Sequence, residues 1–181
     1  MNYNFPTPGP PPAYLTNVSI ASLGIQGDIN SAFNEWTTAN QANGALVGFY
    51  SGGSNGPYRV YAYRVNDPSV APYAAFTEVA LYGGTRTIAV ASTDLYIGSI
   101  SSSGYPNYDE NAGNYHAFIK KVMLHEIGHT MDLTDQPFID GAQCGGQVAG
   151  ESVMNYQCGT NDIAGNVPSM VSACDNASVH Y

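Results

Sequence analysis

The sequence of 181 residues carries little charge: Asp, Glu, Lys and Arg make up 10% of it, and only five residues are basic. The net charge of -9 would repel a phosphate backbone, which argues against nucleic acid as a partner. No run approaches the roughly 18 apolar residues needed to cross a bilayer, so we expect no membrane partner. Abundant Gly, Ser, Asn and Tyr indicate a surface solvated by hydroxyl and amide groups, which is common in secreted proteins.

The first residues, MNYNFPTPGPPPAY, lack the basic and apolar regions of a signal peptide. They predict a flexible, proline-rich segment over residues 1–13. Residues 14–181 fit a single domain with a sizeable core, divided into subdomains over about 14–131 and 132–181. We expect a secreted, extracellular protein whose leader and pro-segment have been cut off. A protein that begins here inside the cell is the alternative.

Cysteine is also scarce, and Cys144, Cys158 and Cys174 all lie in the C-terminal part. The secreted composition favours one disulfide there, with three pairings open, over three small buried thiols. Their spacing matches no zinc site built from cysteines.

Hydrophobic periodicity predicts the order of elements. It predicts strands over 16–22, 45–50, 58–65, 77–84 and 85–93, and helices over 23–39 and 114–131. The pair Ser172 and Asp175 predicts a cap for a short final helix within 168–181, in an otherwise irregular C-terminal part. The order of strand, helix, several strands and helix predicts an α/β or α+β fold with a mixed sheet.

The segment HEIGHTMDLTD, residues 125–135, contains the candidate chemistry. His125 and His129 are about one helical turn apart on one face, so both imidazoles can reach one zinc ion at about 2.0–2.1 Å. Glu126 lies beside the first ligand and can reach a zinc-bound water without binding the metal. The surrounding residues are apolar, and a metal removes the cost of burying two unpaired histidines. The alternative is two core or surface histidines without a metal.

A catalytic zinc site needs a third protein ligand and an open position. Asp135, ten residues after His125, can supply it if the helix ends near Met131 and the chain turns back under the metal. Two other acids compete for this role. Glu151 lies in GESVMNY, which does not look helical, and Asp162 lies further along the chain than aspartate-type zincins allow.

HEIGHTMDLTD, followed by SVMNY over 152–156, resembles the metzincin zinc metalloproteases, whose signature is HExxHxxGxxH or HExxHxxGxxD before a methionine turn. The final aspartate resembles the snapalysin-like group. HEIGH is similar to the bacterial HEIGH metallopeptidases, whose third ligand is usually histidine. The motifs cover only 125–135 and 152–156, while the order of elements is similar from about residue 14. The resemblance implies a zincin fold, with a twisted mixed sheet packed on two long helices and an irregular C-terminal subdomain.

The resemblance also implies roles for single residues. Met154 would be the methionine of the Met-turn under the metal ligands, which differs little from a core methionine. Tyr156 stands where astacins and serralysins carry a tyrosine that approaches the metal, so it is a candidate for stabilising the transition state; a tyrosine that simply packs nearby is the alternative. The family's glycine after the helix is replaced by Asp132, which accepts a left-handed backbone better than most residues.

Together these residues predict a secreted hydrolase, a zinc metalloendopeptidase with one catalytic Zn²⁺. A zinc-bound water activated by Glu126 would cleave the peptide bond. We expect a monomer whose polypeptide substrate lies along an edge strand, with TEVALYGG (77–84) as the candidate, and a pocket walled by residues 157–168. Calcium remains an unsupported option, because no spaced Asp/Asn loop of the usual kind occurs among the 14 acids.

Two other functions fit the same motif. A secreted binding protein could hold zinc structurally with His116 or His180 as fourth ligand, although neither has motif spacing. A zinc hydrolase with this site could also act on something other than protein. Measurable proteolysis with one metal per chain would argue against the first, and peptide, glycan and acyl substrates tested together would separate the second. If His116 is not a zinc ligand, we expect it either at the surface or in contact with the residues that hold the metal.

Overall fold

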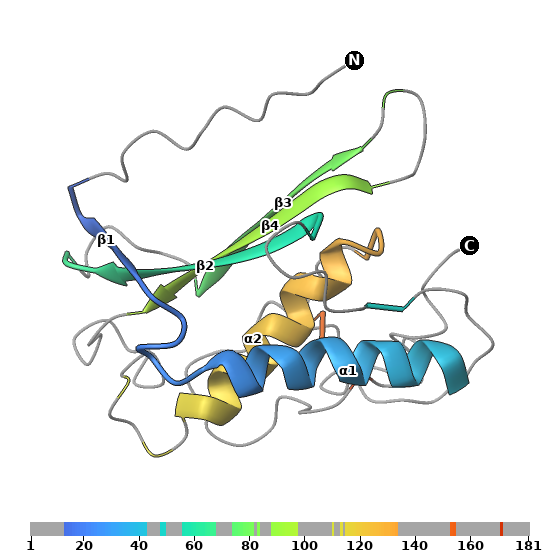
Figure 1. Cartoon of the computed structure of the whole chain (residues 1–181), viewed down its shortest axis with the longest axis horizontal. Helices are drawn as coiled ribbons and strands as arrows, with labels where there is room; N and C mark the ends of the chain where they lie inside the picture. Colours follow the sequence, from blue (N-terminus) through green and yellow to red (C-terminus); the bar gives the residue numbers. More distant parts are fainter. Residues whose placement is uncertain are drawn as a thin grey trace, which may run out of the picture.

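The computed structural model of the chain describes residues 13–42, 48–49, 56–67, 74–81, 83, 88–97, 110, 113, 115–133, 153–154 and 171. The elements in this part are β1 (Leu15–Val18), α1 (Gln26–Ala42), β2 (Tyr58–Val65), β3 (Ala75–Leu81), β4 (Ile88–Ile97) and α2 (Tyr115–His129). They form a four-stranded sheet and two helices (Figure 1). The predicted mixed α/β architecture is therefore confirmed.

The sheet is mixed, with the strand order β1-β2-β4-β3. β2 and β4 run parallel in its centre, while β1 pairs antiparallel with β2 and β3 pairs antiparallel with β4. Both helices lie on the same face of the sheet, where α1 packs on α2 (Figure 1). Among the described strands, β3 is therefore an edge strand, and α2 is the helix that contacts it.

Four of the five predicted strands are present, the first of them as the shorter β1. β2 has the predicted range, β3 begins and ends earlier than 77–84, and β4 is shifted toward its C-terminus relative to 85–93. The prediction over 45–50 lies largely outside the described residues, and the two described there, Gly48 and Phe49, are not in a strand.

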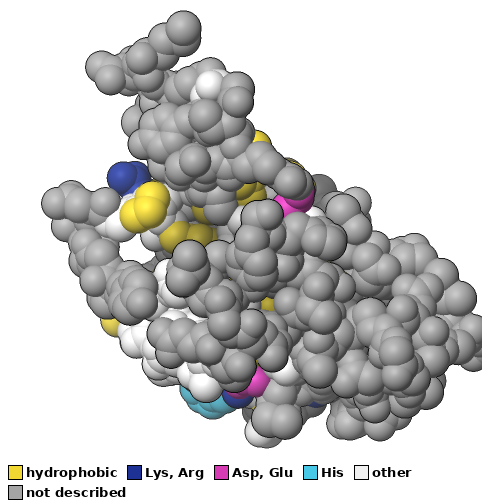
Figure 2. All heavy atoms as spheres, turned by 90° about the vertical axis from the view of Figure 1, so that its right-hand side faces the viewer, with side chains coloured by type: hydrophobic (Ala, Val, Ile, Leu, Met, Phe, Trp, Pro, Cys, Tyr) yellow, Lys and Arg dark blue, Asp and Glu magenta, His cyan; other side chains and the backbone are white. Residues whose placement is uncertain are grey.

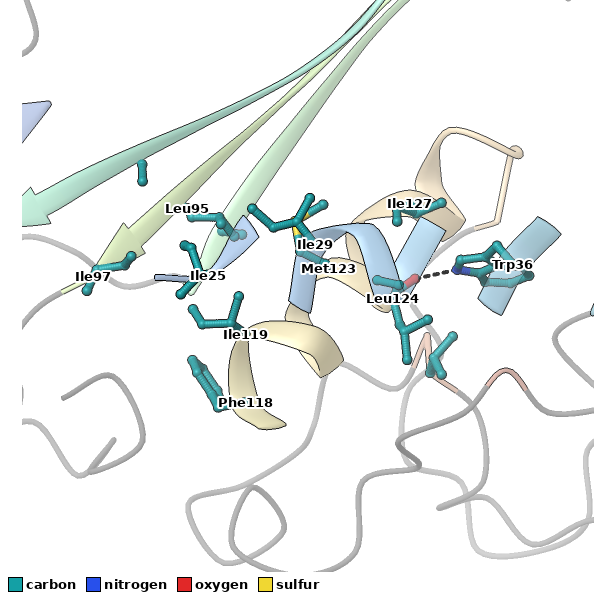
Figure 3. Close-up of a cluster of buried hydrophobic side chains, with 14 of the residues drawn as sticks. Ile25, Ile29, Trp36, Leu95, Ile97, Phe118, Ile119, Met123, Leu124 and Ile127 are labelled. Carbon is teal, nitrogen blue, oxygen red and sulfur yellow. Dashed lines mark hydrogen bonds between the residues drawn. The ribbon is translucent and has the colours of Figure 1, made fainter. Parts of the chain in front are cut away.

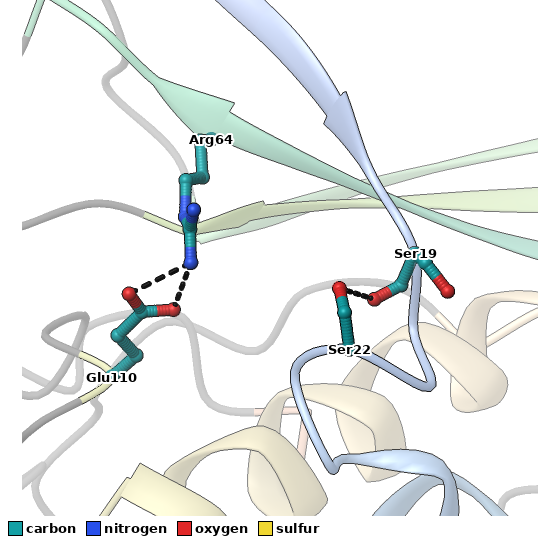
Figure 4. A network of polar contacts seen from close by, with 4 residues as sticks. All are labelled: Ser19, Ser22, Arg64 and Glu110. Atoms are coloured by element: carbon teal, nitrogen blue, oxygen red, sulfur yellow. Dashed lines mark hydrogen bonds and ion pairs between the residues drawn. The ribbon is translucent and has the colours of Figure 1, made fainter.

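The prediction that the first strand continues to residue 22 is wrong. β1 ends at Val18, because the chain turns between Ser19 and Gly24. The Ser22 hydroxyl donates to the Ser19 carbonyl at 2.7 Å (Figure 4). The Leu23 N–H donates to the same carbonyl at 3.2 Å. These local bonds offer the backbone an alternative to the sheet ladder, so the strand stops.

The same turn delays α1, which begins at Gln26 and not at residue 23. Gly24 has a φ of 69°, a left-handed conformation that a helix cannot include. The Ile25 carbonyl then accepts the first helical bonds, from the N–H groups of Asp28 and Ile29, both at 3.1 Å. α2 agrees with the predicted helix, and the predicted final helix lies outside the described residues except for Val171, which is not helical.

The core lies between the helices and the sheet (Figure 3). Its large, almost fully buried apolar side chains include Ile25 and Trp36 from α1, Met123, Leu124 and Ile127 from α2, and Leu95 and Ile97 from β4. Trp36 Nε1 donates a buried hydrogen bond of 2.9 Å to the Leu124 carbonyl. This bond and the packing around it hold α2 in place against α1, just before the first of the two histidines.

Ion pairs connect the elements at the surface. Arg64 on β2 donates to both carboxylate oxygens of Glu110 (Figure 4), and Lys120 on α2 pairs with Glu35 on α1 at 2.7 Å. The second oxygen of Glu35 accepts the Val171 N–H at 3.0 Å, which ties a C-terminal residue to both helices. In the described part of the chain, no helix has the length and apolar character of a membrane span.

Candidate metal centre

The last turn of α2 brings the two histidines of HEIGH together. His125 Nε2 and His129 Nε2 are 3.2 Å apart, and the rings are nearly perpendicular. The spacing of four residues places both on one face of the helix, as predicted.

Each imidazole also contacts a main-chain carbonyl through its other nitrogen. His125 Nδ1 lies 2.8 Å from the Val153 oxygen, and His129 Nδ1 lies 2.9 Å from the Leu133 oxygen. A carbonyl oxygen can only accept, so both Nδ1 atoms must carry the proton and donate. In the neutral rings, the lone pairs are therefore on the two Nε2 atoms.

This donor set fits a zinc ion. Two lone pairs that face each other at 3.2 Å repel, and a cation bound by both removes the repulsion. Tetrahedral zinc with bonds of about 2.0–2.1 Å separates two ligand nitrogens by roughly 3.3 Å, close to the distance found here. Hydrogen bonds from Nδ1 to main-chain carbonyls are the usual way to fix the orientation of histidine ligands.

Met154 is buried against α2 at Gly128, a residue that lies between the two histidines in the sequence. A Cβ atom at Gly128 would overlap Met154 Sδ and would lie 3.2 Å from Met154 Cε, with Trp36 at 3.5 Å beside it. The absence of a side chain at Gly128 therefore lets the segment 153–154 approach the helix. This close approach accompanies the contact between the Val153 carbonyl and His125.

After α2 the chain reverses at Asp132, which has a φ of 66°. The N–H of Asp132 donates to the His129 carbonyl at 3.2 Å, and the N–H of Leu133 donates to the Gly128 carbonyl at 3.3 Å. These two bonds around a left-handed residue are the Schellman motif that ends many helices. Asp132 thus adopts the backbone conformation expected at this position.

Glu126 points away from solvent, with 6% of its surface exposed. Close by on the sheet, the hydroxyls of Tyr58, Thr93 and Thr77 form a chain with distances of 2.6 and 2.7 Å. Burial raises the pKa of Tyr58, and the negative charge of Glu126 adds to the rise against the lowering effect of the Thr93 hydrogen bond. The carboxylate therefore lies near neutral hydroxyl groups in the interior.

Sequence reasoning missed these hydroxyl groups. A signal exists, because alternation along β4 places Thr93 between the buried Ala91 and Leu95 on the helix-facing side. A threonine at an inward position needs a hydrogen-bond partner. Its partners could not be identified without the strand register, which sets Thr77 opposite Thr93.

Several predicted residues lie outside the described part of the chain: Asp135, Tyr156, the competing acids Glu151 and Asp162, His180 and the three cysteines. Their roles, including the third ligand and the disulfide, stay predictions. Among the residues that are described, no group of three or more His, Cys, Asp or Glu side chains could hold a metal. The described part of the centre is the histidine pair.

His116 does not belong to this pair. It lies nine residues before His125, roughly 13 Å along the helix axis. Its side chain is 63% exposed, and its Nδ1 lies 2.6 Å from an Asp28 oxygen on α1. The surface position expected for His116 is confirmed, and a role as fourth ligand to His125 and His129 does not fit this position.

The edge strand β3 has large hydrophobic side chains at the surface. Phe76 is 52% exposed, and Val79 and Leu81 are also exposed. Hydrophobic side chains are likewise visible on the face of the molecule in Figure 2. β3 therefore has an apolar character that is unusual for an edge strand, since edges are more often protected by charge.

Comparisons of the chain with protein families, with curated proteins and with solved structures found no match.

Proposed function

We propose that this protein is a zinc metalloendopeptidase of the metzincin type, with a metzincin-like zincin fold. The observation that carries the proposal is the pair of Nε2 atoms 3.2 Å apart, each on a ring whose Nδ1 donates to a main-chain carbonyl. The mixed sheet with two helices on one face is compatible with this class.

His125, His129 and Asp135 would hold the zinc ion, which leaves one position for water or substrate. When bound, zinc would lower the pKa of a coordinated water to about 7 and would polarise the carbonyl group of the substrate. The protein orients the imidazoles from behind, through the carbonyls of Val153 and Leu133.

Glu126 is the proposed general base. It follows the first ligand directly and is held in the interior beside the hydroxyl chain of the sheet. It would take the proton of the attacking water and pass it to the leaving amine. Tyr156 is the proposed donor to the oxygen that gains charge in the transition state.

The proposed substrate is an extended polypeptide that pairs with β3. An edge strand has main-chain N–H and C=O groups for such pairing, and β3 contacts α2, the helix of the histidines. Val79 is exposed and, like Thr77, projects from the helix-facing side of the sheet, so this edge should prefer an apolar residue in the substrate. Residues 157–168 are proposed to form a further wall of the pocket.

The proposal is tested with Glu126→Gln, which keeps the size of the side chain and removes the base. We expect zinc to remain bound in a ratio of one per chain, and cleavage of a peptide library to fall by at least about 100-fold. Glu110→Gln is the matched control and should keep the activity, because Glu110 is exposed and pairs with Arg64 on β2, away from the proposed substrate strand. Cleavage by Glu126→Gln near the wild-type rate would contradict this mechanism.

A further inference from the structure

We propose, building on the zinc site above, that the left-handed backbone of Asp132 is a positioning device that fixes the orientation and tautomer of His129. The side chain of Asp132 is exposed, and the proposed role belongs to its main chain. The φ of 66° reverses the chain just after the helix and turns the carbonyl of the next residue, Leu133, toward His129.

The geometry closes a small ring of contacts. His129 contributes its carbonyl to the N–H of Asp132 at 3.2 Å, and its Nδ1 donates to the carbonyl of Leu133 at 2.9 Å. The Leu133 N–H is held in turn by the Gly128 carbonyl, and its side chain is buried. The N–H and the side chain of Leu133 are therefore both held in place. The backbone conformation at Asp132 determines the direction in which the Leu133 carbonyl points.

The consequence concerns which nitrogen faces the metal. With Leu133 as acceptor, the proton stays on Nδ1 and Nε2 has the lone pair that a metal needs. If the chain leaves the left-handed region at 132, the carbonyl turns away and the proton can move to Nε2. The ring must then rotate or change tautomer before it binds zinc. Loss of such an orienting partner typically costs about 10- to 100-fold in metal affinity.

The test replaces Asp132 by residues that differ in their tolerance of a positive φ. Gly and Asn accept this region, whereas the β-branched Val does not. We expect Asp132→Gly and Asp132→Asn to bind zinc within roughly threefold of wild type. Asp132→Val should bind about 10- to 100-fold more weakly in competition with a chelating dye.

The matched control is Gly24→Val. Gly24 has nearly the same φ, 69°, is exposed, and leaves room for a side chain, but it precedes the other helix. It should lower thermal stability and leave zinc affinity unchanged. An equal loss of zinc affinity in Gly24→Val and Asp132→Val would mean that global destabilisation is responsible, and would overturn the proposal. A large loss in Asp132→Gly would also overturn it, because the side chain and not the backbone would then matter.

A second measurement needs neither metal nor activity. Long-range proton–nitrogen NMR spectra of the metal-free protein report the tautomer of each histidine, and we expect wild-type His129 to carry its proton on Nδ1. In Asp132→Val a substantial fraction should move to Nε2. An Nε2-protonated His129 in the wild type overturns the proposal even if the valine variant does not fold. A protein that binds zinc and shows these shifts but cleaves no peptide would remove the proposed function and leave this positioning role.

Discussion

At the scale of the residue, the most constrained position described near the proposed metal centre is Gly128, which has no side chain at all. Met154 occupies the space where a Cβ atom would be, and Met154 itself is almost fully buried. Because Met154 is enclosed by the core, its sulfur atom has little room to move away from an added methyl group. Even one added methyl group is therefore a packing change in the interior.

We expect Gly128→Ala to destabilise the protein by about 1–3 kcal/mol, the usual cost of overpacking a core. The measurement is the free energy of unfolding from urea denaturation. Gly27→Ala is the control, because Gly27 is also helical but has no atom within 4 Å of the added Cβ. It should be neutral or gain up to about 1 kcal/mol. Equal stabilities of the two variants would show that Met154 adapts without cost.

At this scale the sequence predicted how the two histidines lie relative to each other, but not all of their hydrogen-bond partners. The separation of four residues suffices to bring the two Nε2 atoms together, because helix geometry is rigid. The left-handed conformation at Asp132 was also predictable, since Asp is one of few residues that tolerate it. The acceptor Val153 was not, because it comes from a segment 28 residues away from His125 and its approach depends on tertiary packing.

At the scale of the element, the pairing of α1 with α2 determines where the histidines lie. Trp36 is fully buried and donates across the interface to the Leu124 carbonyl, one residue before His125. The indole also lies 3.5 Å from the position that a Cβ atom of Gly128 would occupy. A single side chain of α1 therefore lies beside the turn of α2 that contains His125 and Gly128.

Trp36→Phe should cost about 2–3 kcal/mol of unfolding free energy, through the lost hydrogen bond and the space left by the smaller ring. Thr38→Ala on the same helix is the control. Thr38 is exposed, and within the described part of the chain its hydroxyl donates to the Asn34 carbonyl of its own helix, so its replacement should change stability by less than about 0.5 kcal/mol. If both variants unfold at the same urea concentration, the indole bond does not support α2.

The elements were predicted best where tertiary structure and local preference agree. β2 and α2 have long, regular apolar patterns, and their predicted ranges are close to those found. The end of β1 and the start of α1 were displaced because Ser22 bonds to the Ser19 carbonyl and Gly24 turns to the left. Such local bonds leave the hydrophobic pattern unchanged, so periodicity cannot detect them.

At the scale of the whole molecule, the two faces of the sheet differ. Both helices cover one face, and Asp94 projects from the other, because its neighbours Thr93 and Leu95 face the helices. Burial raises the pKa of Asp94 from 3.8 to about 6, and the charge of Glu78 adds to the rise. The folded protein thus binds this proton more tightly than the unfolded chain.

The sign of the pH dependence follows from this difference. Between pH 3.8 and about 6 the folded state holds more protons, so the contribution of Asp94 to stability falls as the pH rises and is constant above that range. Asp94→Asn removes the charge and should be more stable than wild type above pH 6, with the advantage lost below pH 3.8. A pKa shift of this size corresponds to about 3 kcal/mol, and solvent screening of the half-buried carboxylate reduces our expectation to about 1 kcal/mol.

The measurement is the unfolding free energy of both proteins across this pH range, where the difference isolates Asp94 from other acids. Glu78→Gln is the control and should retain most of the slope, because burial is the larger cause of the raised pKa. Parallel curves for wild type and Asp94→Asn would show that Asp94 titrates normally in the folded protein.

Metal binding should also be visible as stability of the whole molecule, because a ligand that binds only the folded state stabilises it by mass action. At a zinc concentration about 100-fold above the dissociation constant, the gain is roughly 2.7 kcal/mol, and chelation should reverse it. His129→Ala removes one nitrogen of the pair 3.2 Å apart, so we expect it to lose most of this gain. His116→Ala removes an exposed imidazole of the same helix and should keep it.

The zinc-dependent increment is the quantity to compare, and not the stability itself, because each substitution also shifts the metal-free baseline. His116 contacts Asp28, so its removal changes that baseline while leaving the paired imidazoles intact. A full increment in His129→Ala would place zinc elsewhere on the chain. Equal losses in both variants would mean that zinc binds histidine side chains without selection, which would contradict a specific site at His125 and His129.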